Sequence, residues 1–185
     1  MYSTLEKWPM VSVDIAILLL NARYLDSIVR QFAVRALDRG LTDGLLESCL
    51  IQMVQLLKNE PHLDNALARF LLRRALLSRR FGHYFFWTLK SQLDDVSCSN
   101  RWAVMLEMYL RGLSPTALKI TLAQVSALDE IERIGNTTAV EADQLEAIKR
   151  LLNRPDIQGK VNKLYNPLNI GIPMEKLLPD KLRGK

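Results

Sequence analysis

Apolar residues recur every three or four positions in one segment after another along this chain. The period is strongest between Thr42 and Pro61, where it is carried by Leu45, Leu46, Cys49, Leu50, Met53, Val54 and Leu57. No segment alternates apolar and polar residues over a useful length, so β-strands have little support. Only eight glycines and seven prolines occur in 185 residues, which leaves few residues for tight hairpins. The sequence therefore predicts an all-α fold.

Capping residues and helix breakers divide the chain into eight expected helices. Hydroxyl or carboxylate side chains able to accept a hydrogen bond from a first-turn amide stand at Ser12, Asp26, Thr42, Asp64 and Ser114. Residues that end or follow helices stand at Gly40, Pro61, Gly112 and Gly135-Asn136. The expected helices cover residues 12–20, 26–40, 42–60, 64–76, 82–93, 97–111, 115–135 and 138–153.

The spacing of these helices indicates an architecture. The first helices of successive pairs begin near residues 12, 42, 82 and 115, an interval of roughly 30 to 40 residues. This interval is typical of an α-solenoid of antiparallel helix pairs, HEAT/armadillo-like, and a closed helical bundle is the alternative. Residues 1–153 would form this domain. Prolines and lysines accumulate afterwards, so residues 154–185 are expected to form an extended basic tail.

Charge and cysteine content favour a cytoplasmic protein that does not bind nucleic acid. The net charge is +5, and charges of opposite sign mostly alternate along the chain instead of gathering on one face. Cys49 and Cys98 form no CxxC pair, which favours free thiols in a reducing compartment. The apolar run from Ile15 to Leu20 is too short for a secretory signal, and Asp14 lies directly before it.

Residue patterns for catalysis are missing from the sequence. His62 follows Pro61 in a loop, and His83 lies in an aromatic run with no cysteine or carboxylate at metal-ligand spacing, so neither histidine has partners for a metal. The glycine-rich phosphate loops, the GxSxG nucleophile motif and the HRD and DFG kinase motifs are absent as well. We therefore predict no catalytic, cofactor-binding or metal-binding residue in this chain.

Two local features rise above this background. Five arginines lie within twelve residues and form a candidate interaction patch for an acidic partner or an anionic membrane: Arg69, Arg73, Arg74, Arg79 and Arg80. A solvated helix surface is the alternative interpretation. The second feature is the aromatic run FGHYFFW from Phe81 to Trp87, which would cover most of a helix circumference and is expected to be buried.

These residues carry a resemblance to a known family. The block DNALARFLLRRALLSRRFGHYFFWTLKSQL (64–93) resembles the hallmark stretch of the helical, or PIK, domain of phosphoinositide 3-kinases. The flanking motifs VRQFAVRAL (29–37), LTDGLLESCLIQMVQLLKNE (41–60) and LEMYLRG (106–112) follow in the same order. The details look most like a class I catalytic subunit, with class II as the alternative. The core of the family motif corresponds to Phe70, Phe81, Gly82, His83, Phe86 and Trp87.

The resemblance implies a scaffold inside a larger lipid kinase. The parent enzyme would use ATP and magnesium to phosphorylate the 3-hydroxyl of inositol lipids, and its catalytic loops would lie beyond Lys185. This chain alone is predicted to be inactive and to need no cofactor. Its implied partners are the kinase, Ras-binding and membrane-targeting domains of the parent and a regulatory subunit, with membrane recruitment only through the parent.

Trp8-Pro9 resembles the interior of the family domain, which implies an incomplete N-terminus. The residues PLN at 167–169 are similar to the family segment that leads toward the kinase lobe, but Ile170 follows where the family usually has proline. A stand-alone helical-repeat module is the alternative.

Overall fold

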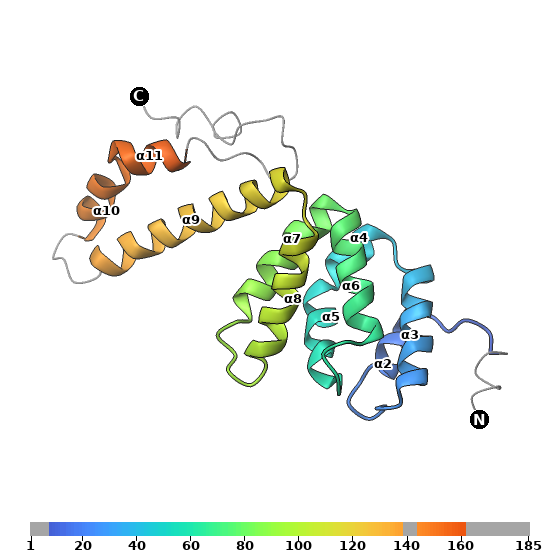
Figure 1. Cartoon of the computed structure of the whole chain (residues 1–185). Helices are drawn as coiled ribbons and strands as arrows, with labels where there is room; N and C mark the ends of the chain where they lie inside the picture. Colours follow the sequence, from blue (N-terminus) through green and yellow to red (C-terminus); the bar gives the residue numbers. More distant parts are fainter. Residues whose placement is uncertain (1–7, 139–143, 162–185) are drawn as a thin grey trace. The chain divides into compact units, whose positions relative to one another are not determined.

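A computed structural model of the chain describes residues 8–138 and 144–161. Ten α-helices and one short 3-10 helix lie within these ranges, and none of these residues belongs to a β-strand. The all-α prediction is therefore confirmed. The chain forms two compact units, Met1–Gly112 and Leu113–Lys185 (Figure 1).

The first unit contains seven α-helices among its described residues. Their bounds are α2 Val13–Leu19, α3 Ser27–Gly40, α4 Asp43–Ser48, α5 Leu50–Leu56, α6 Ala66–Leu77, α7 Arg79–Ser91 and α8 Ser99–Gly112, with the 3-10 helix η1 at Leu57–Asn59. Three predicted caps are confirmed. The Asp26 carboxylate accepts from the Ile28 amide at 2.9 Å, and the hydroxyls of Ser12 and Thr42 accept from amides three residues on.

Two helix starts differ from the prediction because an unexpected side chain caps the helix, and α8 begins at Ser99, two residues after its predicted start. Asn65 caps α6 by accepting from the Ala68 amide at 2.8 Å, whereas the predicted cap Asp64 pairs with Arg69 instead. Ser78 accepts from the Phe81 amide at 3.3 Å, so α7 begins at Arg79, before the predicted start at Gly82.

The predicted helix at 42–60 bends at Cys49 and divides into α4, α5 and η1. The Cys49 backbone has φ −103° and ψ 10°, outside the regular α-helical range. Its amide still donates to the Leu45 carbonyl and its carbonyl accepts from Met53. The hydrogen-bond ladder therefore continues through a change of direction.

Helices α6 and α7 lie at the centre of the first unit. α6 packs against α3, α7 and α8, and α7 packs against α4, α5, α6 and α8. Phe81, Phe85 and Trp102 are fully buried there, and the Phe85 ring meets Tyr109 edge-on with centroids 5.8 Å apart. The same burial raises the pKa of Tyr109 to about 12, because an apolar surrounding disfavours the phenolate.

Gly82 permits the close crossing of α7 with its neighbours. A Cβ atom at this position would lie 2.4 Å from the Ala75 carbonyl oxygen and 2.5 Å from the Tyr109 hydroxyl. Both distances are shorter than a carbon–oxygen contact allows, so any larger residue would push α6 and α8 away from α7. The glycine of the GHYFFW motif is therefore required by packing.

The second unit consists of α9 Pro115–Thr138, α10 Gln144–Leu152 and α11 Pro155–Val161 among its described residues. α9 packs against both shorter helices, with Ala127, Ile134, Ala147 and Ile157 buried. The predicted end of α9 at Gly135-Asn136 is wrong, since the helix continues to Thr138.

The extended conformation predicted from residue 154 onward is wrong for residues 155–161, which form α11. Pro155 occupies the first helical position, where the missing amide hydrogen costs nothing. The remainder of the predicted tail, 162–185, lies outside the described residues, as do residues 139–143 of the predicted helix 138–153. The division into a domain at 1–153 and a tail at 154–185 stays a prediction.

Neighbouring helices of the first unit contact each other largely in chain order: α2 with α3, α3 with α6, α6 with α7, and α7 with α8. A solenoid requires such neighbours, but α6 also packs against α8, and the solenoid arrangement stays a prediction. Among the described helices, none combines the length and the apolar character needed to cross a bilayer.

Candidate interaction surface

The five arginines of the candidate patch occupy two consecutive helices. Arg69, Arg73 and Arg74 lie on α6, and Arg79 and Arg80 form the first turn of α7. Ser78, between the two groups, is the last residue before α7 and caps it. Arg69 and Arg73 share a face of α6, as their spacing predicts, and both are exposed.

Four of these arginines form ion pairs within the first unit. Arg69 binds Asp64 with two hydrogen bonds of 2.6 and 2.5 Å, and Arg73 binds Asp38 on α3 at 2.5 Å. The remaining pairs are Arg74 with Asp43 and Asp38, and Arg80 with Glu47. The hydrogen bond from Arg69 holds the pKa of Asp64 below its ordinary value, and the same bond raises the pKa of Arg69.

Arg79 differs from the other four because it forms no ion pair with any residue that the structure describes. Four carboxylates thus accompany five guanidinium groups, so the patch carries a smaller excess of positive charge than the sequence alone indicates. Its pairs tie α6 and α7 to α3 and α4. The arginines therefore contribute to contacts between helices as well as to the surface.

A cleft of about 360 Å³ opens between the ion-paired arginines. It lies where the last turns of α3 and α6 meet the first residues of α4 and α7. Its lining consists of Asp38, Asp43, Arg73, Arg74, Leu77 and Ser78. Sequence reasoning missed the cleft, because its charged residues are about 35 positions apart in the chain and only the packing of α3 against α6 brings them together.

The aromatic motif is buried on one side of α7. Phe70, Phe81 and Phe86 are buried with Gly82, whereas His83 and Trp87 are half-buried. Burial lowers the pKa of His83 because it disfavours the charged imidazolium.

The prediction that this run covers most of the helix with buried side chains is wrong for Tyr84, which is 41% exposed. Tyr84 lies on an exposed stripe of α7 together with Arg80 and Ser91.

A buried polar cluster centred on Glu60 also escaped sequence reasoning. The side chains of Arg30 and Glu60 are 3% and 4% exposed and form an ion pair of 2.8 Å. Arg30 also donates to the Tyr24 carbonyl at 2.8 Å, and Arg101 donates to the carbonyls of Glu60 and His62. The sequence contains one indication of this cluster: Arg30 lies three residues before the buried Ala33 and therefore on the apolar face of α3.

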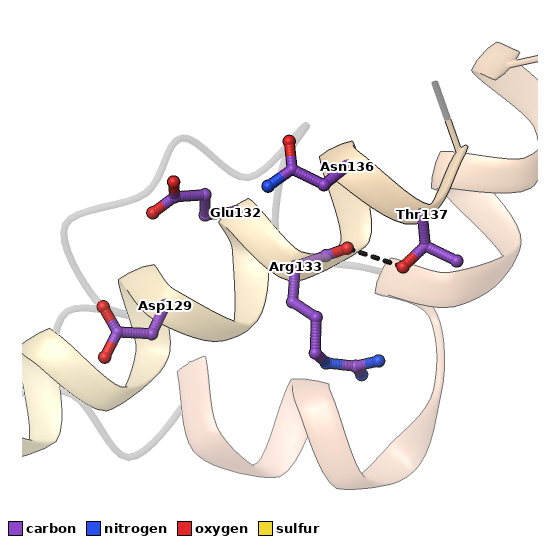
Figure 2. Close-up of a pocket in the computed structure, with 5 residues that line it drawn as sticks. All are labelled: Asp129, Glu132, Arg133, Asn136 and Thr137. Carbon is purple, nitrogen blue, oxygen red and sulfur yellow. Dashed lines mark hydrogen bonds between the residues drawn. The ribbon is translucent and has the colours of Figure 1, made fainter. Parts of the chain in front are cut away.

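A second cleft, of about 480 Å³, lies along α9 in the second unit and is lined by Asp129, Glu132, Arg133, Asn136 and Thr137. Figure 2 shows these side chains on successive turns of the helix, with the Thr137 hydroxyl donating to the Arg133 carbonyl at 2.8 Å. The Arg133 guanidinium pairs with Glu130. No nucleophile stands beside a base in this cleft, so its lining residues carry no recognisable chemistry.

No group of three histidine, cysteine or carboxylate side chains gathers within the described ranges at a spacing that could hold a metal ion. Neither Cys49 nor Cys98 forms a disulfide there. The arginine patch with its cleft is the candidate site for an interaction.

The chain is similar to known lipid kinases. The model of the phosphoinositide 3-kinase family accessory domain (PIK domain) matches residues 1–121. Phosphatidylinositol 3-kinase 1 of Dictyostelium discoideum is 40% identical over 147 residues, which covers 80% of this chain and 9% of that protein. Phosphatidylinositol 3-kinase age-1 of Caenorhabditis elegans is 30% identical over an alignment of 188 positions, which covers 98% of this chain and 16% of that protein.

The family match includes every described helix of the first unit and the first residues of α9. The chain spans less than a fifth of the length of each of these two relatives. The match over 121 of 185 residues, together with the all-α fold, establishes the relationship. The chain belongs to the phosphoinositide 3-kinase family and contains its accessory PIK domain.

Proposed function

We propose that this chain is the helical scaffold of a phosphoinositide 3-kinase catalytic subunit and performs no phosphoryl transfer by itself. The observation that carries the proposal is the match of the PIK accessory domain over residues 1–121, which includes the densely packed first unit. The parent enzyme would use ATP and magnesium to phosphorylate the 3-hydroxyl of inositol lipids. The kinase motifs missing from this sequence would come from other parts of the parent.

The scaffold would hold the kinase, Ras-binding and membrane-targeting domains and would accept a regulatory subunit. A rigid core suits this task, because neighbouring domains are positioned only as precisely as the surface that carries them. The fully buried rings of Phe81, Phe85 and Trp102 and the buried Arg30–Glu60 pair supply that rigidity. We place the protein in the cytoplasm, with membrane recruitment through the parent enzyme.

A chimaera tests the scaffold role. The aligned segment of the Dictyostelium phosphatidylinositol 3-kinase 1 is replaced by the matching residues of this chain, and lipid phosphorylation is measured with phosphatidylinositol, ATP and magnesium. We expect the chimaera to retain activity. Phe85→Ala in the inserted segment should reduce it, because truncating a buried phenylalanine costs about 3–5 kcal/mol of stability. Tyr84→Ala, at an exposed neighbouring position, is the matched control and should leave activity unchanged.

The isolated chain provides the complementary measurement. Under the same assay conditions we expect no 3-phosphorylated lipid from the purified 185-residue protein. Reproducible product formation by this chain, or a chimaera that is folded and inactive, would contradict the proposal.

The stand-alone module that binds through its arginines has less support as the main function. Four of its five arginines are already paired with carboxylates of the same unit, which reduces the charge available to a partner. The arginine cleft is therefore better considered as an additional surface on the scaffold.

A further inference from the structure

In the cleft between α3, α4 and α6, two arginines pair with two aspartates, and a carboxylate of another molecule can take the place of an aspartate. Arg73 pairs with Asp38 and Arg74 pairs with Asp43, each at 2.5 Å. The carboxylates are only partly covered, with side-chain exposures of 35% for Asp38 and 58% for Asp43. Ion pairs whose carboxylates remain in contact with water contribute little to stability, and this applies most to Arg73–Asp38, so an incoming carboxylate can replace an aspartate at small cost.

Three further arginines lie close in sequence to residues that line the cleft, and they have no ion pair within the described part of the chain. Arg39 follows the lining residue Asp38, Arg35 lies one turn earlier on α3, and Arg79 follows the lining residue Ser78. All three are exposed. The lining itself holds two arginines and two aspartates, and the three exposed arginines next to it in sequence give this part of the unit an excess of three positive charges. This excess attracts an anionic partner and accelerates its approach.

An exposed apolar residue completes the surface. Leu77 lines the cleft and is 77% exposed, and its neighbour Leu76 is 44% exposed. A leucine so exposed gains by being covered, since removing apolar area from water is favourable. The cleft thus offers guanidinium groups and an apolar contact side by side.

The shape distinguishes between two kinds of anionic partner. The Arg74 side chain is only 16% exposed and lies inside the cleft, where a flat bilayer surface does not reach it. A peptide side chain can enter a cleft of about 360 Å³, and guanidinium groups bind carboxylates in a forked geometry. We propose that this cleft binds an acidic peptide segment of a partner protein, with carboxylates at Arg39, Arg73, Arg74 and Arg79 and an apolar side chain on Leu77. The proposal is independent of the scaffold role.

The first test is peptide binding by the complete chain, measured by fluorescence anisotropy at low salt. The probe is a short labelled peptide with alternating glutamate and leucine, and the same peptide with glutamine in place of glutamate is its control. The double variant Arg39→Glu/Arg79→Glu should weaken binding of the acidic peptide by about tenfold or more, because two attractive charges become repulsive. Arg23→Glu is the matched control, because it reverses the charge of an exposed arginine far from the cleft. Arg23 precedes the N-terminus of α3, and the cleft lies at the C-terminal end of this helix, which is about 20 Å long.

The second test predicts tighter binding instead of weaker binding. A variant that only damaged the fold would not bind the peptide more tightly, so this test separates the two explanations. Asp38→Asn/Asp43→Asn removes the carboxylates that occupy Arg73 and Arg74 and should tighten binding of the acidic peptide by about three-fold to tenfold. Binding should also weaken with added salt, because screening shortens the reach of exposed charges.

Three outcomes would overturn the proposal. In the first, Arg23→Glu weakens binding as much as the double arginine variant. In the second, the asparagine variant binds the acidic peptide no more tightly than the original chain. In the third, the chain binds vesicles of phosphatidylserine and phosphatidylcholine but neither peptide, which would assign the surface to a membrane.

Discussion

Arginine serves two different purposes in the first unit, one buried and one exposed. Arg30 lies beneath the surface with Glu60, and its guanidinium also satisfies the carbonyl oxygens of Asn21 and Tyr24. Arg69 and Arg73 form pairs of similar length at the surface, but their side chains are 74% and 55% exposed. The two sets have the same chemistry and similar distances. Their environments differ, and this difference decides what each pair contributes.

The buried cluster connects parts of the unit that are distant in sequence. Arg30 extends from α3, Glu60 follows η1, and Arg101 reaches the same turn from α8. Water has little access to the Arg30–Glu60 pair, so losing one partner of this pair leaves a buried group unsatisfied. The exposed pairs are in contact with water, which substitutes for a lost partner at little cost.

The largest expected effect comes from removing the buried guanidinium. Arg30→Met retains an unbranched side chain and leaves the Glu60 carboxylate buried without its counter-charge. We expect the free energy of unfolding to fall by about 3–5 kcal/mol, measured by urea denaturation of the complete chain. Arg30→Met/Glu60→Leu should recover a large part of this loss, because no uncompensated charge remains. A decrease below about 1 kcal/mol for the single variant would remove the distinction between the buried and exposed arginines.

An intermediate effect is expected at Arg101. Its guanidinium donates to the carbonyls of His62 at 2.9 Å and Glu60 at 2.7 Å, and the second of these bonds is partly buried. Arg101→Ala should reduce the free energy of unfolding by about 1–3 kcal/mol, less than the loss from Arg30→Met, since carbonyl groups are neutral. The same denaturation experiment checks this. A loss larger than that of Arg30→Met would mean that hydrogen bonding to the turn matters more than the buried charge.

The smallest effect is expected at Arg69, where the pKa of Asp64 is the more informative readout. Arg69→Gln removes the hydrogen bond that lowers this pKa from its ordinary value of 3.8, so the pKa should rise. A carboxyl with a lowered folded-state pKa stabilises the fold above its unfolded pKa and loses this contribution as the pH falls through the folded value. The stability difference between the variant and the original chain should therefore be complete above about pH 4 and should disappear as the pH falls through the lowered pKa of Asp64.

Carboxyl NMR titration measures this pKa directly, and stability at neutral pH should change less than in either buried-arginine variant. Asp95 provides an internal reference. Its pKa is lowered to about 2 by Lys58 and Ser97, and it should not respond to Arg69→Gln. An unchanged Asp64 pKa would show that the exposed pair does not persist in solution.

Local sequence patterns predicted the features that depend on neighbouring residues. Helix periodicity predicted the all-α fold, and Ser12, Asp26 and Thr42 cap the helices that they were expected to cap. Each of these interactions spans only two or three residues, so the chain itself brings the partners together. The predicted cap Asp64 shows the limit, because Asn65 caps α6 instead while Asp64 pairs with Arg69.

Features that depend on distant residues were missed for a physical reason. The cleft needs Asp38 beside Arg73, and the buried cluster needs Glu60 beside Arg30. Sequence spacing alone does not indicate such pairs, because they form only when packed helices meet. The arginines at 69–80 were identified as a patch, but their counter-charges were not. The sequence therefore overestimated the free positive charge.

The sequence by itself determined the helical class, most helix boundaries and the PIK domain family, because periodicity, capping and motif order are properties of local stretches. Only the tertiary structure decided which arginines are buried, which are paired and which remain available around the cleft. Burial and pairing depend on side chains that approach through space, and the strength of a charge interaction depends on how much water remains around it.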